Sequence, residues 1–164
     1  MFEPVALESV DPGAVEALLD DAFGADRFRR TAYLLRTRSR AIAPLSLAVQ
    51  QSGQLLGSIQ CWPVRIGGFP LVLVGPVAVA TTEQGKGIGQ LLMHSMLAAA
   101  AKIGEPAMVM IGDPEYYERF GFTADATGGW TLPGPWEPRR LLARNAAGLP
   151  LPAAGMIEED DRAL

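Results

Sequence analysis

The chain has 164 residues, 49% of them hydrophobic, which is enough for one domain with a sizeable core. Its formal net charge of -4 argues against a nucleic-acid partner, which requires a basic face. Its single cysteine excludes an internal disulfide, and it has no run of about 18 apolar residues that predicts a membrane span. We therefore expect one cytoplasmic domain over residues 1–164, with no nucleic-acid or membrane partner and with mobile residues from about 153 onward.

Two helices are predicted ahead of the first strand. Asp11-Pro12 provides an N-cap and a first-turn proline for a helix whose apolar residues continue to Phe23 and which ends near Gly24. Asp26 is expected to cap a second helix that includes residues 33–35. The main basic cluster falls here, and we interpret it as the exposed side of this helix because charge runs usually face solvent. Its members are the arginines at positions 27, 29, 30, 36, 38 and 40.

A β-hairpin follows these helices. Residues 45–50 and 55–64 are strand-like runs, and the glycine in the connecting segment 51–54 is typical of a hairpin turn. Cys61 lies within the second run, where a lone cysteine usually acts as a small apolar residue. We therefore expect Cys61 to pack in the sheet and to take no part in covalent chemistry.

The next strand, residues 71–79, carries Gly75-Pro76 in its middle. Proline cannot donate to a strand ladder and glycine weakens a strand interior, so this pair predicts a bulge or splay. A splay at this position would free the backbone N–H groups of Val77 and Val79 for a ligand.

A glycine-rich loop runs from this strand directly into a helical pattern: Gln84-Gly85-Lys86-Gly87-Ile88-Gly89. The first N–H groups of a helix have no partners and lie at the positive end of its dipole, so they bind anions. Glycine allows positive φ angles and the close approach of a phosphate. The P-loop requires Ser or Thr after its lysine, and the dinucleotide fingerprint requires a glycine where Leu92 stands. We therefore predict a phosphate-binding loop of another kind.

The helix that opens at this loop ends at Gly104 and carries one apolar stripe that is expected to pack on the sheet. His94 lies opposite this stripe and is expected to face solvent rather than to act in catalysis. The apolar run 107–111 is typical of a central strand buried on both faces. The stripe consists of Ile88, Leu91, Leu92, Met96, Ala99 and Ile103.

The last third of the chain begins with a short helix, which Asp113-Pro114 caps and Gly121 ends. Trp130 and Trp136 lie in the Gly- and Pro-rich segment beyond it, and they either wall a substrate pocket or plug the end of the sheet. A further strand is predicted over residues 140–144.

Two segments of the chain resemble motifs of one family. Residues 84–89 resemble the coenzyme A loop Q/R-x-x-G-x-G/A of the GNAT acetyltransferase superfamily. Residues 112–122, Gly-Asp-Pro-Glu-Tyr-Tyr-Glu-Arg-Phe-Gly-Phe, resemble its Tyr-x-x-x-Gly-Phe signature. Two motifs in the right order are more specific than either alone, and the resemblance covers roughly residues 45–122. The doubled tyrosine is most similar to a branch of small predicted N-acetyltransferases.

The resemblance implies an α/β domain with a mixed, splayed sheet flanked by helices. It also implies transfer of an acetyl group from acetyl-CoA, without a metal, to a primary amine of a small molecule or peptide by direct attack in a ternary complex. A catalytically weak acyl-CoA sensor and a transferase of a longer acyl group are the alternatives, and the assembly state stays open, a homodimer included. The residues implied in cofactor binding are Val77, Val79, Gln84, Gly85, Lys86, Gly87, Ile88, Gly89 and Gln90.

In the family, the tyrosine that donates to the departing thiolate corresponds to Tyr117, which leaves Tyr116 as a packing residue. Acyl transfer builds negative charge on the thioester oxygen and then on sulfur. The backbone N–H of Val77 can stabilise the oxygen and the Tyr117 phenol can donate to the sulfur. With ordinary pKa values of about 10 for tyrosine and about 8.5 for a thiol, hydrogen bonding is better supported than complete proton transfer. The alternative interpretation of Tyr117, which the family match weakens, is a core aromatic with a satisfied hydroxyl.

No general base is assigned from the sequence. Glu83 is explained by loop support and Asp113 by capping, while Glu115 and Glu118 are ordinary helix-surface residues. The family often has asparagine where this chain has Gly112-Asp113, so a cofactor contact through asparagine is not expected.

Overall fold

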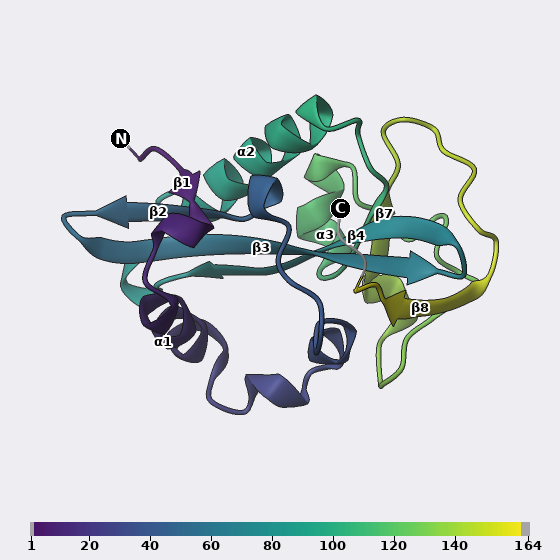
Figure 1. Ribbon diagram of the computed structural model, residues 1–164, viewed down its shortest axis with the longest axis horizontal. Coiled ribbons are helices and arrows are strands. Elements are labelled where there is room, and N and C mark those ends of the chain that lie inside the picture. Colours follow the sequence, from purple (N-terminus) through teal and green to yellow (C-terminus); the bar gives the residue numbers. More distant parts are fainter. Residues whose placement is uncertain (1, 162–164) are drawn as a thin grey trace.

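A β-sheet organises residues 2–161, the part of the chain that the computed structural model describes (Figure 1). The strands are β1 (Val5–Ala6), β2 (Leu47–Gln51), β3 (Gln54–Ile66), β4 (Phe69–Val79), β5 (Met108–Ile111), β6 (Trp130–Thr131), β7 (Leu141–Arg144) and β8 (Gly155–Glu159). The α-helices are α1 (Pro12–Phe23), α2 (Ile88–Lys102) and α3 (Pro114–Tyr117). Short 3-10 helices lie at Leu7–Ser9, Arg27–Arg29, Thr31–Leu35, Ala43–Leu45, Thr81–Glu83, Glu118–Phe120 and Pro138–Arg140.

The sheet is mixed. Its strands follow the order β1-β2-β3-β4-β5-β7, and β8 pairs with both β3 and β6. Neighbouring strands are antiparallel except in the parallel pairs β4–β5 and β6–β8. The predicted α/β class, with a mixed sheet between helices, is confirmed.

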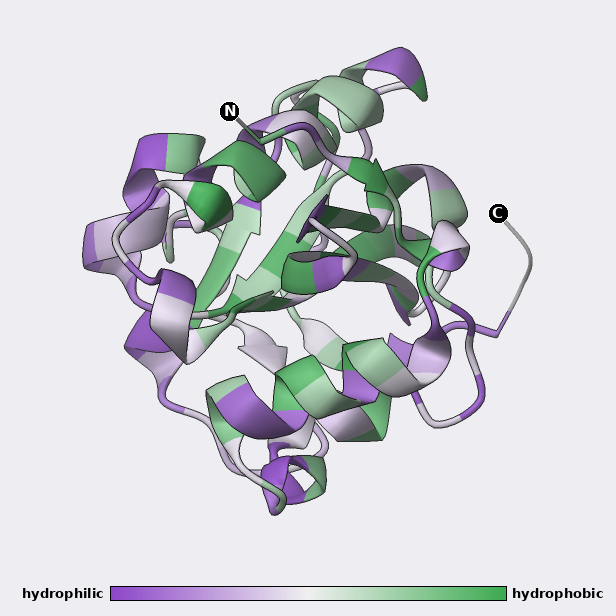
Figure 2. Ribbon diagram, turned by 90° about the vertical axis from the view of Figure 1, so that its left-hand side faces the viewer, coloured by the Kyte–Doolittle hydropathy of each residue, from purple (hydrophilic) through white to green (hydrophobic). Residues whose placement is uncertain are grey.

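Helices cover both faces of the sheet (Figure 1). α1 and the 3-10 helices Arg27–Arg29 and Thr31–Leu35 lie on one side, and α2 and α3 lie on the other. α2 packs through the fully buried Leu92 and Met96, and α1 packs through Leu18 and Leu19. The strands between these layers are largely hydrophobic (Figure 2). Among the helices of the described residues, none is long and apolar enough to cross a membrane.

α1 begins and ends where the sequence predicts. The backbone N–H of Ala14 donates to Asp11 Oδ2 at 3.2 Å, so the aspartate satisfies a donor in the first turn. Gly24 follows the last helical residue with a φ of +89°, a conformation that glycine adopts without strain.

α2 also ends as predicted, but its buried stripe differs from the expected one. Gly104 has a φ of +101°, and the N–H of Glu105 donates to Ala100 O at 3.0 Å, as in a Schellman motif. Met93 and Ala100 are fully buried, whereas Ile103 is 50% exposed. Ile103 is the C-cap, where the chain leaves the helix, so helical spacing no longer decides where its side chain lies.

The predicted second helix is wrong. Asp26 makes no side-chain capping bond, and the segment forms two 3-10 helices that Arg30 interrupts with extended φ and ψ angles of -69° and 142°. The solvent-facing interpretation of the arginines fails for Arg27, which is 2% exposed, and for Arg36, which is half-buried. Arg27 reaches back to carboxylates on α1, and such long-range pairing has no signature in helical spacing.

The C-terminal segment is ordered further than expected. β8 pairs with β3 from Val64↔Glu159 to Ile66↔Ile157, although residues from about 153 onward were expected to be mobile. Ile157 is fully buried, and the Glu159 carboxylate accepts hydrogen bonds from Thr37 Oγ1 and the N–H of Ser39 at 2.7 and 2.8 Å. Burial of one apolar side chain and these bonds explain the added strand. The rest of this expectation, residues 162–164, lies outside the described residues.

Trp130 plugs the end of the sheet. It is 2% exposed in the cluster that contains Val109 and Leu141, and its Nε1 donates to Pro152 O at 2.8 Å. Trp136 packs against the same cluster. Of the two alternatives for these tryptophans, the structure supports packing.

Candidate active site

β4 and β5 separate in the middle of the sheet. They pair at Val72↔Met108 and at Leu73↔Val109. β4 continues to Val79, but no described residue of β5 pairs with it beyond Leu73. β5 remains paired with β7 as far as Ile111. The two strands therefore open toward their C-terminal ends, where β4 leads to α2.

A bulge lies at the point where β4 loses its β5 partner. Two residues of β4, Gly75 and Pro76, face one residue of β3, Gln60, where the register of the two strands shifts. The bulge predicted from this dipeptide is confirmed.

Backbone donors of β4 change sides across the bulge. Before the bulge, the N–H of Val72 donates at 2.9 Å to Ala107 O, on the β5 side. After it, the N–H of Ala80 donates to Leu56 O at 2.8 Å, on the β3 side. N–H directions alternate along a strand, so even-numbered residues face β5 before the bulge and β3 after it. The N–H groups of Val77 and Val79 therefore face the opening.

The loop between β4 and α2 leaves backbone donors exposed. Gly85 and Gly87 have φ angles of +82° and +79°, and Gly87 is the N-cap of α2 without a side-chain cap. Leu91 N makes the first helical bond, to Gly87 O at 3.0 Å, so the N–H groups of residues 88–90 have no partner within the helix. A Cβ built on either glycine meets nothing within 4 Å. The open space beyond these two glycines therefore lies next to backbone N–H groups that have no partner within the helix.

Side chains hold this loop in place. Thr81 N donates to Asp21 Oδ2 of α1 at 3.0 Å, and Gln84 Nε2 donates to Val79 O at 3.3 Å. Lys86 Nζ lies 3.1 Å from Glu83 Oε1. Glu83 therefore supports the loop, as its position in the sequence suggests.

A pocket of about 220 Å³ lies between β4, α2, α3 and the end of α1. Five of the predicted site residues line it: Val77, Val79, Gln84, Gly89 and Tyr117. Ala22, Phe23, Ala78, Met93 and Tyr116 complete the lining. The other predicted residues, Gly85, Lys86, Gly87, Ile88 and Gln90, lie in the adjoining loop and first turn of α2. Ile88 is 1% exposed and packs in the core, so only its backbone is available to a ligand.

Tyr117 places a neutral hydroxyl at this pocket. Its ring packs edge-on against Tyr116, with centroids 4.9 Å apart. Burial raises the pKa of Tyr117 to about 12, and the neighbouring Tyr116 and Asp113 add to the shift. The phenol therefore remains a hydrogen-bond donor across the neutral pH range.

This environment predicts that Tyr117 contributes almost no phenolate at pH 10, where an ordinary tyrosine is half ionised, because desolvation disfavours the anion. Phenolate absorbance of the wild type and of Tyr117→Phe should therefore be equal at pH 10, with circular dichroism used to verify that both are folded. An excess of half a phenolate per molecule in the wild type would contradict the assignment.

Three contributors to the pocket escaped the sequence analysis. Tyr116 lines the pocket and is more than a packing residue, since its hydroxyl lies 4.0 Å from where a Cβ on Gly89 would stand. Gly112 makes room for the neighbouring ring, because a Cβ there would lie 2.6 Å from Tyr117 Cε2. Gly112 stands where the family often has asparagine, and this difference in the sequence is a signal for the close approach of the Tyr117 ring. Phe23 lines the pocket only because α1 packs on β4, which no local pattern indicates.

Asp113 does not cap α3 with its side chain, contrary to the expectation. Its backbone carbonyl accepts from Tyr117 N at 2.9 Å, while its carboxylate lies 3.4 Å from Arg140 Nε. The ion pair with a residue beside β7 holds the carboxylate away from the helix N-terminus. His94 is exposed, as predicted, and packs edge-on against Phe120.

Known proteins are similar to this chain in sequence and in fold. Residues 44–124 match the family model of the acetyltransferase (GNAT) domain. The uncharacterised N-acetyltransferase YhbS of Escherichia coli K12 is 32% identical over 115 residues, which cover 69% of this chain and 68% of YhbS.

Solved structures agree in fold. The E. coli YhbS structure in complex with CoA has a TM-score of 0.77 at 23% identity, covering 97% of this chain and 89% of that one. A GNAT family acetyltransferase from Brucella melitensis in complex with acetyl-CoA has a TM-score of 0.65 at 27% identity, covering 98% and 96%.

Proposed function

The chain belongs to the GNAT acetyltransferase family, and from this premise we propose that it transfers an acetyl group from acetyl-CoA to a primary amine by direct attack in a ternary complex. One juxtaposition carries the proposal: the freed N–H groups of β4, the loop that opens α2 and the Tyr117 hydroxyl meet around a single pocket. The CoA and acetyl-CoA complexes of YhbS and of the Brucella protein support it.

The chain offers donors that fit coenzyme A. The N–H groups of residues 88–90 and the positive end of α2 suit its diphosphate, and Lys86 adds a cationic side chain beside them. The empty space beyond Gly85 and Gly87 leaves room for a bulky anion. The N–H groups of Val77 and Val79 suit the arm of coenzyme A that carries its amide groups. This arm would pair with β4 in the way that an added β-strand pairs with a sheet edge.

Two donors of the chain match the charges that acyl transfer develops. Bound acetyl-CoA supplies an acyl group activated as a thioester. The N–H of Val77 stabilises negative charge on the thioester oxygen, a contact worth about 2.7–4 kcal/mol in comparable sites. The Tyr117 hydroxyl donates a hydrogen bond to the departing sulfur. Its raised pKa favours this hydrogen bond over complete proton transfer.

The proton of the attacking amine leaves through water in this proposal. No Asp, Glu or His among the described residues lines the pocket at Tyr117. Water can enter from the exposed loop 84–87. No side chain is therefore assigned as the general base.

Cys61→Ala should leave turnover within about threefold of the wild type, because no covalent acyl-enzyme on this residue is involved. Cys61 is fully buried in the core, and burial raises the pKa of its thiol, so the reactive thiolate is suppressed. The free energy of unfolding should fall by about 1 kcal/mol, because a small cavity is left. Steady-state kinetics with denaturant unfolding checks both, and a large loss of kcat in a folded variant would point to a ping-pong mechanism.

Calorimetric titration of ligand-free protein with acetyl-CoA tests the proposed function, with ATP and NAD as controls. Selective, saturable binding of acetyl-CoA followed by amine-dependent thiol release is the expected result. Binding without thiol release for any amine would favour an acyl-CoA sensor instead. Failure to bind acetyl-CoA would refute the assignment of the loop.

A further inference from the structure

A second, larger hollow of about 870 Å³ lies on the α1 side of the sheet. α1, the 3-10 helices Arg27–Arg29 and Thr31–Leu35, and β3 enclose it. Its lining is mostly apolar, and Phe28 and Leu34 on it are 57% and 47% exposed. This volume falls within the range of about 300–1,000 Å³ that small-molecule sites occupy.

The floor of this hollow adjoins the proposed reaction centre. Gln60 and Trp62 of β3 line it, and Gln60 faces the bulge of β4. The Trp62 Nε1 donates to Gly75 O at 2.9 Å, which fixes the floor to that bulge. Gln60 is next in sequence to Ile59, the register partner of Val77. The part of β3 that floors the hollow is therefore next along the strand to the position paired with Val77.

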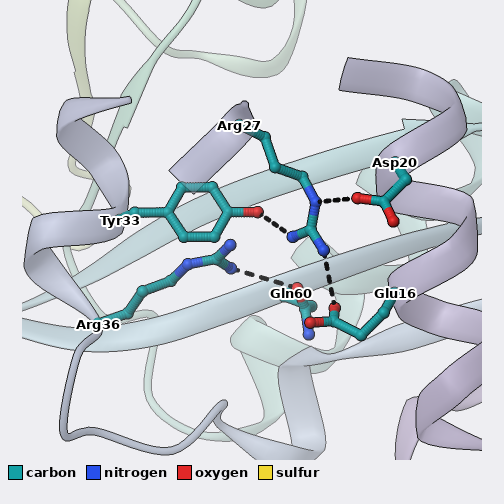
Figure 3. Close-up of polar contacts among 6 residues, drawn as sticks. All are labelled: Glu16, Asp20, Arg27, Tyr33, Arg36 and Gln60. Carbon is teal, nitrogen blue, oxygen red and sulfur yellow. Dashed lines mark hydrogen bonds and ion pairs between the residues drawn. The ribbon is translucent and has the colours of Figure 1, made fainter. Parts of the chain in front are cut away.

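The charge of Arg27, on one wall, is already compensated (Figure 3). Its Nε lies 3.0 Å from Asp20 Oδ1, and its Nη2 lies 3.4 Å from Glu16 Oε2. A further N–H donates to the Tyr33 hydroxyl. Arg27 thus serves to hold the 3-10 helix to α1.

Arg36, on the same hollow, has no such partner. Its guanidinium stacks 3.7 Å from the Tyr33 ring centroid and 4.8 Å from that of Trp62. Its Nη1 donates at 3.3 Å to the neutral amide oxygen of Gln60 (Figure 3). No carboxylate of the described residues lies within ion-pair distance of it. Arg36 is therefore a half-buried cation that makes no ion pair with a described residue.

The geometry of Arg36 suits a planar anion. A guanidinium has five N–H donors in its plane; Gln60 engages Nη1 of Arg36, and the Nε and Nη2 donors remain to bind a carboxylate in a bidentate manner. Burial lowers the pKa of Arg36, Tyr33 and the Glu16 carboxylate offset part of this effect, and the charge of Arg27 adds to it; a bound anion would therefore stabilise the charged form. Glu16 is engaged by Arg27, and Glu8, the other carboxylate of the lining, is exposed to solvent.

We infer, resting on the proposed function, that the acceptor is an amine of the amino-acid class, whose carboxylate binds Arg36 and whose apolar or aromatic group fills the hollow. The amine nitrogen forms the new bond to the acetyl carbon and the thioester carbon–sulfur bond breaks. Sulfur leaves as the thiolate of coenzyme A, with a hydrogen bond from Tyr117, the amine proton passes to water, and the released thiolate then takes a proton from water. Arg36 acts as a specificity residue and not as a catalytic one.

Matched acceptors test this inference directly. Phenylalanine, leucine and methionine are each assayed as the free acid, the amide and the decarboxylated amine, with thiol release at saturating acetyl-CoA. In parallel, each acid is titrated calorimetrically into protein saturated with CoA, where no turnover occurs. We expect at least one acid to bind and to exceed its own amide about tenfold to hundredfold in kcat/KM, as for loss of a charge-assisted contact.

Arg36→Met should abolish this preference, because kcat/KM should fall far more for the acid than for the amide. Arg36→Lys keeps the charge and should retain part of the preference, and it serves as the second variant if the methionine variant does not fold. The matched control is Arg29→Met, an exposed arginine of the same segment, which should behave as the wild type. If the role of Arg36 were purely structural, its substitution would lower kcat/KM equally for the acid and for the amide. That result would overturn the inference.

Other outcomes separate the inference from the proposed function. Higher kcat/KM for an amide or decarboxylated amine than for every acid overturns the carboxylate assignment and retains the acetyltransferase. Absence of calorimetric binding by all three acids at roughly 10 mM, an affinity too weak for a built site, overturns it as well. Failure of acetyl-CoA binding refutes the proposed function; the acids are then titrated into ligand-free protein, which tests the carboxylate site by itself.

Discussion

Gly87→Glu is expected to weaken acetyl-CoA binding by about 100-fold or more, which is about 2.7 kcal/mol. Gly87 is the N-cap of α2, and the space beyond it is open. A glutamate there would place a carboxylate among the N–H groups of residues 88–90, where it competes with the diphosphate for the same donors and repels it. Calorimetric titration with acetyl-CoA measures the change.

The matched control for this variant is Gly148→Glu. Gly148 has a φ of +67°, against +79° for Gly87, and a Cβ on either meets nothing within 4 Å. Both substitutions therefore impose a similar backbone strain and the same charge. Gly148 lies in the turn after β7, and β7 pairs its last residue with the first residue of β5, at the end of the sheet away from the loop. Equal losses of affinity in both variants would show that strain or charge, and not the position, is responsible.

Tyr117→Phe should lower kcat by about 10²–10³-fold, the usual effect of removing one positioned hydrogen-bond donor to developing negative charge, while the acetyl-CoA dissociation constant changes little. The ring and its contacts with Tyr116 and Gly112 remain, so only the donor to sulfur is removed. Single-turnover thiol release together with calorimetry separates the rate from the affinity.

Tyr116→Phe is the control for this substitution. Tyr116 shares the helix, the pocket and the edge-on contact with Tyr117, but the family signature assigns the donor to the residue four positions before Gly121. The neighbouring variant should keep kcat within about fivefold, as expected for loss of a solvent-accessible hydroxyl. A larger effect at Tyr116 than at Tyr117 would exchange the two roles.

The local backbone features of the site, namely its bulge, its glycine turn and the helix ends beside it, can be predicted from the sequence. Gly75-Pro76 predicts a bulge because proline lacks the N–H that a ladder requires, and the bulge is found. Gly85 and Gly87 predict a turn with positive φ, and both adopt it. The cap of α1 and the end of α2 at Gly104 follow in the same way. Each of these features depends on backbone sterics within a few residues, which one segment specifies without help from the rest of the chain.

What the sequence leaves open depends on partners far along the chain. Asp113 has the pattern of a cap, but an ion pair with Arg140 takes its carboxylate. Residues 155–159 join the sheet because Ile157 finds a buried site and Glu159 finds donors on residues 37–39. Competition between a local and a distant partner is decided by packing, which spacing along the chain does not encode.

The sequence, with the family resemblance it carries, determined the sheet class, the bulge, the glycine loop with positive φ angles and the order of the two family motifs. Only the tertiary structure decided that two tyrosines share one pocket with the end of α1, and that Arg27 is paired while Arg36 is not. The physical reason is that a basic run carries the same formal charge wherever it lies. Its burial and its carboxylate neighbours, which set what each arginine can bind, arise only when α1, the 3-10 helices and β3 come together.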